Sequence, residues 1–269
     1  MGDAIIYTVF TKPWPQLSAA ELGEFIASLG FRGIELPVRP GFQVEPENVR
    51  ADLPRFAQEL RAFGLRIYSV AGPKDEATIA ACAEAGVPTI RVCERIGPEG
   101  YLATEAALRR EYDALQPLLE KHGVRIGIQN HNGRDIANAV AVMRLIGDYD
   151  PRYFGLVWDA AHEALAGTEP ELALEIGWSH LCLVNLKNGY WQRLNGPEAE
   201  YATWKTYWTS GRHGLASWPR VVAELKRRRY AGVVCLTAEY SDHDAVNRLI
   251  AEDIAFAKAL FAESALGEG

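Results

Sequence analysis

The chain has 269 residues, of which 48% are hydrophobic and 23% charged, and its formal net charge is −7. These values are typical of an ordinary globular protein with one large domain or two small ones. The acidic balance argues against a nucleic-acid partner, because phosphate binding relies on a concentrated excess of Lys and Arg. No apolar run is long enough to span a membrane, and the first residues lack the features of a signal peptide. We therefore expect a cytoplasmic protein with no membrane or nucleic-acid partner.

Strand-like and helix-like patterns alternate along the chain. Ser18 and Glu21 have the spacing of a capping box, which predicts that a helix begins there and continues to Leu29. The other predicted helices cover residues 47–63, 76–85, 104–122, 136–146, 171–177, 218–229 and 244–261. The predicted strands cover residues 4–10, 33–38, 66–71, 89–93, 125–130, 154–158, 180–186 and 233–238.

Eight strands, each followed by a helix, predict a (β/α)8 TIM barrel that forms a single domain over residues 1–269. Apolar strands such as GLVW and GVVCL suit parallel strands that are buried on both faces. An open doubly wound sheet is the alternative, but no GxGxxG motif follows the first strand. The four cysteines form no CxxC pair and lie mostly in apolar runs, so we expect reduced, buried thiols at Cys82, Cys93, Cys182 and Cys235.

The connection between the seventh strand and its helix is about thirty residues long, far beyond a usual βα loop. Loops of this length are usually functional lids or carry a small structure of their own. Their aromatic side chains can stack on a sugar ring, pack on one another or contact a second subunit, so a homodimer is one expectation. The aromatic residues are Tyr190, Trp191, Tyr201, Trp204, Tyr207 and Trp208.

Polar side chains follow most of the predicted strands. The carboxyl ends of barrel strands meet at one mouth, so we expect these side chains to converge there. A lone His at such a position is as often a packing residue as a functional one, and loop cations are usually solvated. Glu35 is expected to pair with Arg91 or Lys12. The candidates are Lys12, Trp14, Glu35, Arg39, Arg91, Glu94, Gln129, Asn130, His131, Asp159, His162, Asn185, Lys187, Asn188 and Glu239.

The order of these strand ends resembles the xylose isomerase-like sugar phosphate isomerase/epimerase superfamily. The resemblance rests on QNH at the fifth strand, DAAH at the sixth, NLKN at the seventh and Glu239 at the eighth, with VFTKPW, GFRGIELPVR and GRHG elsewhere. It implies that one divalent metal is bound by the residues at positions 129, 159, 185 and 239. The superfamily has Glu, Asp, His and Glu there, whereas this chain has Gln129, Asp159, Asn185 and Glu239. Asn188 likewise replaces an Asp.

The substitutions leave two negative charges where the resemblance implies three. The remaining oxygen ligands suit magnesium, manganese or calcium, so we expect either one weakly held ion of this kind or none. Gln129 cannot accept a proton, which excludes a mechanism with two carboxylates. We therefore expect Glu239 to be the base, and the partner acid to be His131, His162 or Lys187.

Two functions fit this set of residues. The first is an isomerase-like or epimerase-like enzyme that abstracts a proton next to a carbonyl of a small sugar, sugar phosphate or cyclitol. The second is a metal-free sugar-binding or regulatory protein on an isomerase scaffold, because amides are good hydroxyl partners and poor acids or bases. An abasic-site endonuclease is disfavoured by the acidic charge. The expected substrate-binding residues are Lys12, Trp14, Arg39, Glu94, Asn188, Trp191 and His213.

Overall fold

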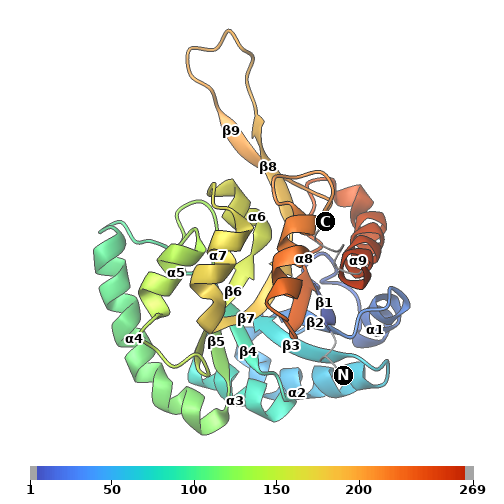
Figure 1. The fold of residues 1–269 in the computed structure, drawn as a ribbon. Helices are drawn as coiled ribbons and strands as arrows, with labels where there is room; N and C mark the ends of the chain where they lie inside the picture. The colour runs from blue at the N-terminus through green and yellow to red at the C-terminus, as the bar shows by residue number, and fades with distance from the viewer. Residues whose placement is uncertain (1–4, 264–269) are drawn as a thin grey trace.

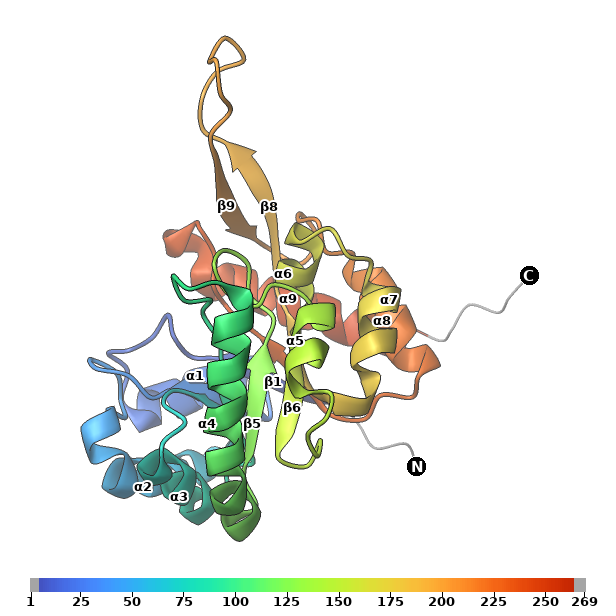
Figure 2. The same cartoon turned by 90° about the vertical axis from the view of Figure 1, so that its left-hand side faces the viewer.

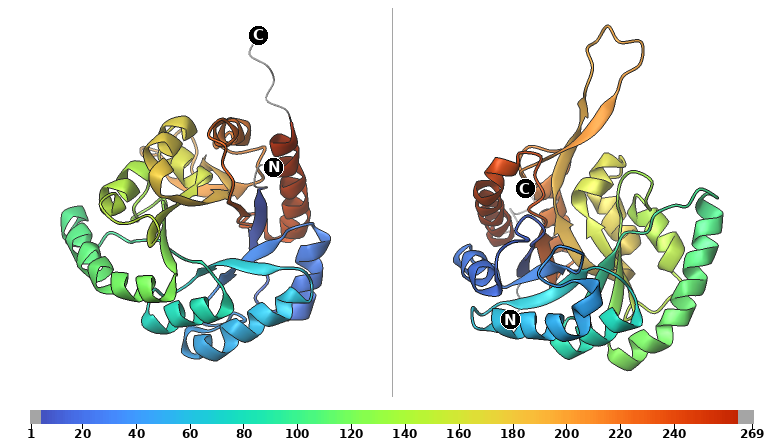
Figure 3. Two further views of the ribbon diagram at one scale, coloured as in Figure 1. Left: turned by 60° about the horizontal axis from the view of Figure 1, so that its bottom comes forward. Right: turned by 180° about the vertical axis from the view of Figure 1, so that it is seen from behind.

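The computed structural model describes residues 5–263, in which eight parallel strands close into a barrel (Figures 1 and 3). The closed order β1-β10-β7-β6-β5-β4-β3-β2 confirms the predicted (β/α)8 barrel. The predicted first strand includes residue 4, which lies outside the described residues. The barrel strands are β1 (Ile6–Phe10), β2 (Gly33–Pro37), β3 (Arg66–Ala71), β4 (Thr89–Val92), β5 (Arg125–Gln129), β6 (Phe154–Asp159), β7 (Leu181–Leu186) and β10 (Val233–Leu236).

Helices surround the barrel on its outer side (Figures 2 and 3). The capping box at Ser18 and Glu21 is confirmed, and Gly86 and Gly123 end their helices with the left-handed backbone that glycine tolerates. Short 3-10 turns at Pro46–Asn48, Trp178–His180 and His243–Ala245 precede α2, β7 and α9. The α-helices are α1 (Ala19–Ser28), α2 (Val49–Arg61), α3 (Glu76–Ala85), α4 (Tyr101–His122), α5 (Ala139–Ile146), α6 (Ala160–Leu165), α7 (Pro170–Gly177), α8 (Trp218–Arg227) and α9 (Val246–Ala262).

Helix α6 was not predicted, and it matters for the site. It has only six residues and begins directly at the end of β6, too short for a periodic pattern. Asp159 is its N-cap, because Oδ1 accepts hydrogen bonds from the backbone N–H groups of Ala161 and His162. The cap fixes both Asp159 and His162 at the carboxyl end of the barrel.

The apolar core has two parts. The larger part fills the space between the strands and the surrounding helices. The smaller part joins side chains from five barrel strands in a layer beneath the polar mouth, namely Phe10, Ala71, Val157, Leu183 and Cys235. The expectation of four buried thiols is wrong for Cys93 and Cys182, which are only partly buried, although all four cysteines are free.

The long connection after β7 forms an antiparallel hairpin, β8 (Asn188–Arg193) and β9 (Trp204–Thr209), which projects away from the barrel (Figures 1 and 2). Its base is attached to the barrel mouth. Trp208 and Ser241 exchange two hydrogen bonds of 2.9 and 3.0 Å. The far half is exposed to solvent, with Trp204 55% and Tyr201 76% accessible. None of the helices in residues 5–263 is both long and apolar enough to cross a membrane.

Candidate active site

A cavity of about 140 Å³ lies at the carboxyl ends of the barrel strands. A cavity of about 520 Å³ adjoins it, and Arg39, Arg91 and Cys93 line both. A third cavity, of about 320 Å³, shares Lys12 and Glu239 with it. Together they offer the room of an ordinary small-molecule site. The 140 Å³ cavity is lined by Phe10, Lys12, Arg39, Arg91, Cys93, Gln129, His131, His162, Asn185, Thr237 and Glu239.

Two lysines hold the carboxylate of Glu239. Lys12 Nζ lies 2.5 Å from Oε1 and Lys187 Nζ lies 2.8 Å from Oε2. The strand order explains the contact, because β10 lies between β1 and β7, whose carboxyl ends lead to Lys12 and Lys187 respectively. Burial by itself would raise the pKa of Glu239, but the charges of Lys187 and Lys12 outweigh it and hold the pKa well below its usual range. Glu239 is therefore a weaker base than the sequence suggested.

A chain of hydrogen bonds crosses the opposite side of the mouth. Arg91 Nη2 lies 2.8 Å from Glu35 Oε2, so Arg91 is the partner of Glu35. Arg91 Nη1 also donates to Gln129 Oε1 at 2.8 Å, and Gln129 Nε2 donates to Asp159 Oδ2 at 3.0 Å. Burial raises the pKa of Asp159, and the positive charge of Lys187 offsets part of this rise. Gln129 is thus a neutral link between a buried cation and a buried carboxyl group.

His131 and His162 face the cavity as different tautomers. Their ring centroids are 4.1 Å apart. His131 Nδ1 lies 2.7 Å from Asp135 Oδ2 and 2.9 Å from Asn132 O, so this nitrogen carries a hydrogen and Nε2 keeps its lone pair. His162 Nδ1 instead accepts the backbone N–H of Asn132 at 3.1 Å, which leaves its hydrogen on Nε2. Burial, assisted by the charge of Lys187, lowers the pKa of His162 well below its usual range and keeps the ring neutral.

Two buried polar atoms at this cavity have no hydrogen-bond partner among the described residues, namely His162 Nε2 and Asn185 Oδ1. Buried polar groups in folded proteins are nearly always hydrogen-bonded. One atom is a donor and the other an acceptor, so a hydroxyl group of a ligand, which both accepts and donates, suits both. The two atoms mark where a polar ligand is expected to bind.

Three of the four residues that the resemblance implies as metal ligands already have their oxygens engaged, so the set does not fit a divalent ion in this arrangement. Both oxygens of Glu239 contact ammonium groups, and the Gln129 oxygen faces the Arg91 guanidinium. Asp159 Oδ1 accepts two backbone hydrogen bonds, and Oδ2 accepts one from Gln129. Across residues 5–263, no group of three or more His, Cys, Asp or Glu side chains is placed to hold a metal ion.

Other residues expected to bind substrate lie outside the 140 Å³ cavity. Glu94 lines the 520 Å³ cavity, where its Oε1 accepts hydrogen bonds from Lys74 and Tyr112. The amide of Asn188 makes four hydrogen bonds to backbone groups and fixes the start of the hairpin. Lys12 and Arg39, in contrast, both line the small cavity.

Three further residues expected to bind substrate contact other parts of the molecule. Trp14 donates to Asn247 Oδ1 on α9. Trp191, on β8 of the hairpin, donates to Leu165 O at the end of α6. His213 is exposed and contacts Ser210.

Several residues of the site were missed by sequence reasoning. Phe10 forms the floor, with the guanidinium carbon of Arg91 4.8 Å from its ring centroid. Thr237 and Cys93 line the cavity wall. Asp135 orients His131, although nothing in its spacing marks it as a site residue. Thr237 had a usable signal, because it lies two residues before Glu239 at the end of the eighth strand.

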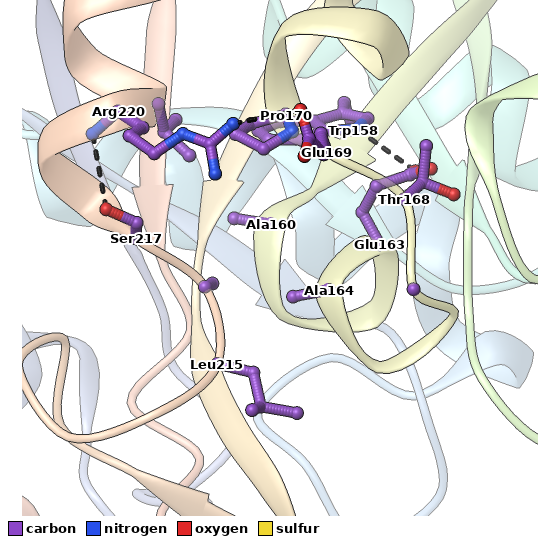
Figure 4. Close-up of a pocket in the computed structure, with 13 residues that line it drawn as sticks. Trp158, Ala160, Glu163, Ala164, Thr168, Glu169, Pro170, Leu215, Ser217 and Arg220 are labelled. Carbon is purple, nitrogen blue, oxygen red and sulfur yellow. Dashed lines mark hydrogen bonds and ion pairs between the residues drawn. The ribbon is translucent and has the colours of Figure 1, made fainter.

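Another cavity, of about 220 Å³, lies outside the barrel between α6, the segment that follows it and the start of α8 (Figure 4). Its wall includes Glu163, whose pKa is raised to about 7 by burial. Arg220 also lines it but is paired with Glu169 and Glu171. None of the residues predicted for the site lines this cavity, so we place the candidate active site at the barrel mouth.

Comparison with solved structures shows the same fold. A 3-keto-D-glucoside 4-epimerase from E. coli superposes with a TM-score of 0.73 at 14% identity, over 95% of this chain and 100% of that chain. A D-psicose 3-epimerase from Clostridium cellulolyticum H10 superposes with a TM-score of 0.71 at 12% identity, over 95% and 99% of the two chains. A xylose isomerase domain protein from Planctomyces limnophilus has a TM-score of 0.72 at 14% identity, over 94% and 95%.

The sequence itself carries the family signature. No curated protein matches the chain in a sequence search. The model of the xylose isomerase-like TIM barrel family, however, matches residues 24–260, which include every barrel strand except β1. The chain therefore belongs to the xylose isomerase-like TIM barrel family.

Proposed function

We propose that the chain is an isomerase-type or epimerase-type enzyme that moves a proton next to the carbonyl of a small sugar or related polyhydroxylated compound. The observation that carries the proposal is the pair of imidazoles at one cavity, one with a free Nε2 lone pair and one with a free Nε2 hydrogen. The sugar epimerases that share the fold support the substrate class.

His131 is the better candidate for the base. Its Nδ1 hydrogen is held by Asp135, so the carboxylate stabilises the imidazolium that forms when Nε2 takes a proton. Glu239, the base expected from the sequence, is instead neutralised by two ammonium groups. A carboxylate paired in this way gains less from accepting a proton.

The proposed reaction begins with transfer of a proton from the substrate to His131. His131 Nε2 takes the proton from the carbon next to the carbonyl, and the electron pair of the broken C–H bond forms a carbon–carbon double bond. The carbonyl oxygen gains the negative charge and accepts a hydrogen bond from His162 Nε2, which is neutral and buried. The hydroxyl proton of the neighbouring carbon then moves to this oxygen, and return of the proton from His131 to the former carbonyl carbon completes an isomerisation.

The sugar-binding alternative rested on amide side chains that could bind hydroxyl groups. Gln129 uses its oxygen for Arg91 and its nitrogen for Asp159, so it has little capacity left for a ligand. Asn185 has the unpaired amide oxygen. A site with one free amide beside two complementary imidazoles favours proton transfer over binding alone.

Hydrogen exchange with solvent tests the proposal, because proton abstraction is the step that isomerases and epimerases share. The protein would be incubated in D2O with D-fructose, D-tagatose, D-fructose 6-phosphate and 2-keto-myo-inositol, and deuterium next to the carbonyl followed by proton NMR. We expect exchange with at least one compound and a loss of about 10²- to 10⁴-fold in His131→Asn. His122→Asn, on the last turn of α4, is the control and should keep full activity. Saturable binding without exchange would favour the sugar-binding function instead.

A further inference from the structure

We infer that Lys12 and Lys187 take the place of the divalent cation in this barrel, with Lys187 anchoring Glu239 and Lys12 presenting its ammonium group to the substrate. The part of this inference that concerns substrate rests on the proposed function. The part that concerns metal binding stands independently, because it follows from the contacts of Glu239 alone.

The two ammonium groups enclose Glu239 from both neighbouring strands. Lys187 follows β7 and Lys12 follows β1, on the two sides of β10. Each carboxylate oxygen receives one ammonium, at 2.5 Å from Lys12 and 2.8 Å from Lys187. A metal ion bound to Glu239 would have to displace at least one of these lysines, and Lys187 is almost fully buried.

Lys187 is also fixed from its other side. Its Nζ lies 3.7 Å from the ring centroid of Trp208, at the base of the hairpin. An ammonium held between an aromatic face and a carboxylate is favourable in a partly desolvated site. Trp208 is itself tied to Ser241 by two hydrogen bonds, so the hairpin helps to hold this cation in place.

The charge balance of the mouth leaves no excess of negative charge for a further cation. Its charged side chains are the cations Lys12, Arg39, Arg91 and Lys187 and the anions Glu35, Asp135, Asp159 and Glu239. The four positive charges already equal the four negative ones before any metal is added, so a divalent ion would gain no net attraction.

Lys12 is the cation of this pair that reaches the ligand. It lines both the 140 Å³ and the 320 Å³ cavities, and its side chain is 44% exposed. An ammonium group has three hydrogens, and the contact with Glu239 uses one of them. The others are free for an oxygen of the substrate, where a positive charge stabilises the negative charge formed on proton abstraction.

Titration with Mn²⁺, followed by electron paramagnetic resonance of the free ion, tests the metal part directly on the wild-type protein. We expect the wild type and Glu239→Gln to bind Mn²⁺ equally poorly. A stoichiometric Mn²⁺ site in the wild type that disappears in Glu239→Gln would overturn the inference, whatever the activity of either protein.

The substrate part is tested by the exchange assay in the presence of EDTA. We expect the exchange rate to be unaffected by EDTA and by added Mn²⁺, and to fall about 100-fold in Lys12→Met. Lys205→Met, at an exposed position on the hairpin, is the matched control and should keep the wild-type rate. Wild-type exchange in Lys12→Met, or exchange that EDTA abolishes, would contradict the role of Lys12. If no compound exchanges, the proposed function fails while the Mn²⁺ result still decides the metal part.

Discussion

Gln129 donates a hydrogen bond of 3.0 Å to Asp159 and thereby occupies a carboxylate oxygen that the family resemblance assigns to a metal. The same amide accepts a hydrogen bond from Arg91. An amide is the side chain that can bridge a guanidinium and a carboxylate, because it is at once a donor and an acceptor. Gln129, which excludes a mechanism with two carboxylates, therefore has a structural role in the mouth.

This relationship predicts the effect of restoring the carboxylate. In Gln129→Glu, a negative charge would replace the donor to Asp159, so two buried carboxylates would face each other. We expect a loss of about 1–3 kcal/mol in the free energy of unfolding, since a hydrogen bond is lost and a buried like-charge contact is created. Urea denaturation measures the change. Gln58→Glu, exposed on α2, is the control and should remain close to the wild type; equal stability of both variants would contradict the bridging role.

The buried ion pair of Glu35 and Arg91 makes a second prediction. The Glu35 side chain is 0% exposed and the Arg91 side chain 8%. In Glu35→Gln the guanidinium would stay buried without its counter-charge, which typically costs about 3–5 kcal/mol. The effect is measured by urea denaturation. Glu252→Gln breaks an exposed pair with Arg248 and should have little effect, so a similar result for both variants would count against the argument.

The alternation of strands and helices was enough to predict the barrel, because each element carries its own periodicity and end signals. The same local reasoning could not find α6 or the two hairpin strands. The short helix α6 begins at the Asp159 N-cap, and β8 and β9 pair with each other within the long connection that follows β7.

The location of the site was predictable because strand ends converge, but its pairings were not. Lys12 and Lys187 are 175 positions apart in the sequence, and both contact Glu239 only because β10 closes the barrel between β1 and β7. The tautomers of His131 and His162 depend on Asp135 and on one backbone N–H, neither of which has a recognisable sequence pattern.

Asp253 makes a prediction about pH. This carboxylate on α9 accepts hydrogen bonds from the backbone N–H of Gly211 and from the Tyr240 hydroxyl. Burial raises the pKa of Asp253 from 3.8 to about 6. The folded state therefore binds a proton at Asp253 more tightly than the unfolded state does. The contribution of this protonation to the stability of the folded protein is complete below about pH 4 and is lost as the pH rises through 6. A shift of this size corresponds to about 3 kcal/mol.

Asp253→Asn removes the titrating group while keeping its shape. The Tyr240 hydroxyl can turn to accept from the new amide, and Gly211 can still donate to the oxygen. We expect the difference in unfolding free energy between the variant and the wild type to rise by about 3 kcal/mol in favour of the variant from pH 4 to pH 7. Urea denaturation at several pH values measures this difference. Asp244→Asn, at an exposed position, should follow the wild type throughout, and parallel pH profiles for all three proteins would refute the assignment.

The far half of the hairpin is expected to contribute nothing to the stability of the barrel. Its hydrogen bonds run within residues 193–203, including Leu194 N to Thr203 O and Asn195 Nδ2 to Tyr201 O. Leu194 N donates to Thr203 O, which makes these two residues a hydrogen-bonded pair, so residues 195–202 can be replaced by a two-residue Asn-Gly turn without changing the register. We expect the shortened chain to keep the urea midpoint of the wild type. Sedimentation of both chains also tests the expected homodimer, for which the exposed aromatic residues of this half are the candidate contacts.

The base of the hairpin should behave in the opposite way, because it is packed on the site. The Trp208 ring lies 5.0 Å from the His162 ring and 3.7 Å from the Lys187 ammonium, measured to the Trp208 ring centroid. We expect Trp208→Ala to lower the free energy of unfolding by about 2–4 kcal/mol, since it removes a large apolar contact and leaves the buried ammonium without its aromatic cover. Trp204→Ala, on the exposed half of the same strand, is the matched control and should be neutral. If both tryptophans proved equally dispensable, the hairpin would not support the site, and Lys187 would be held by Glu239 alone.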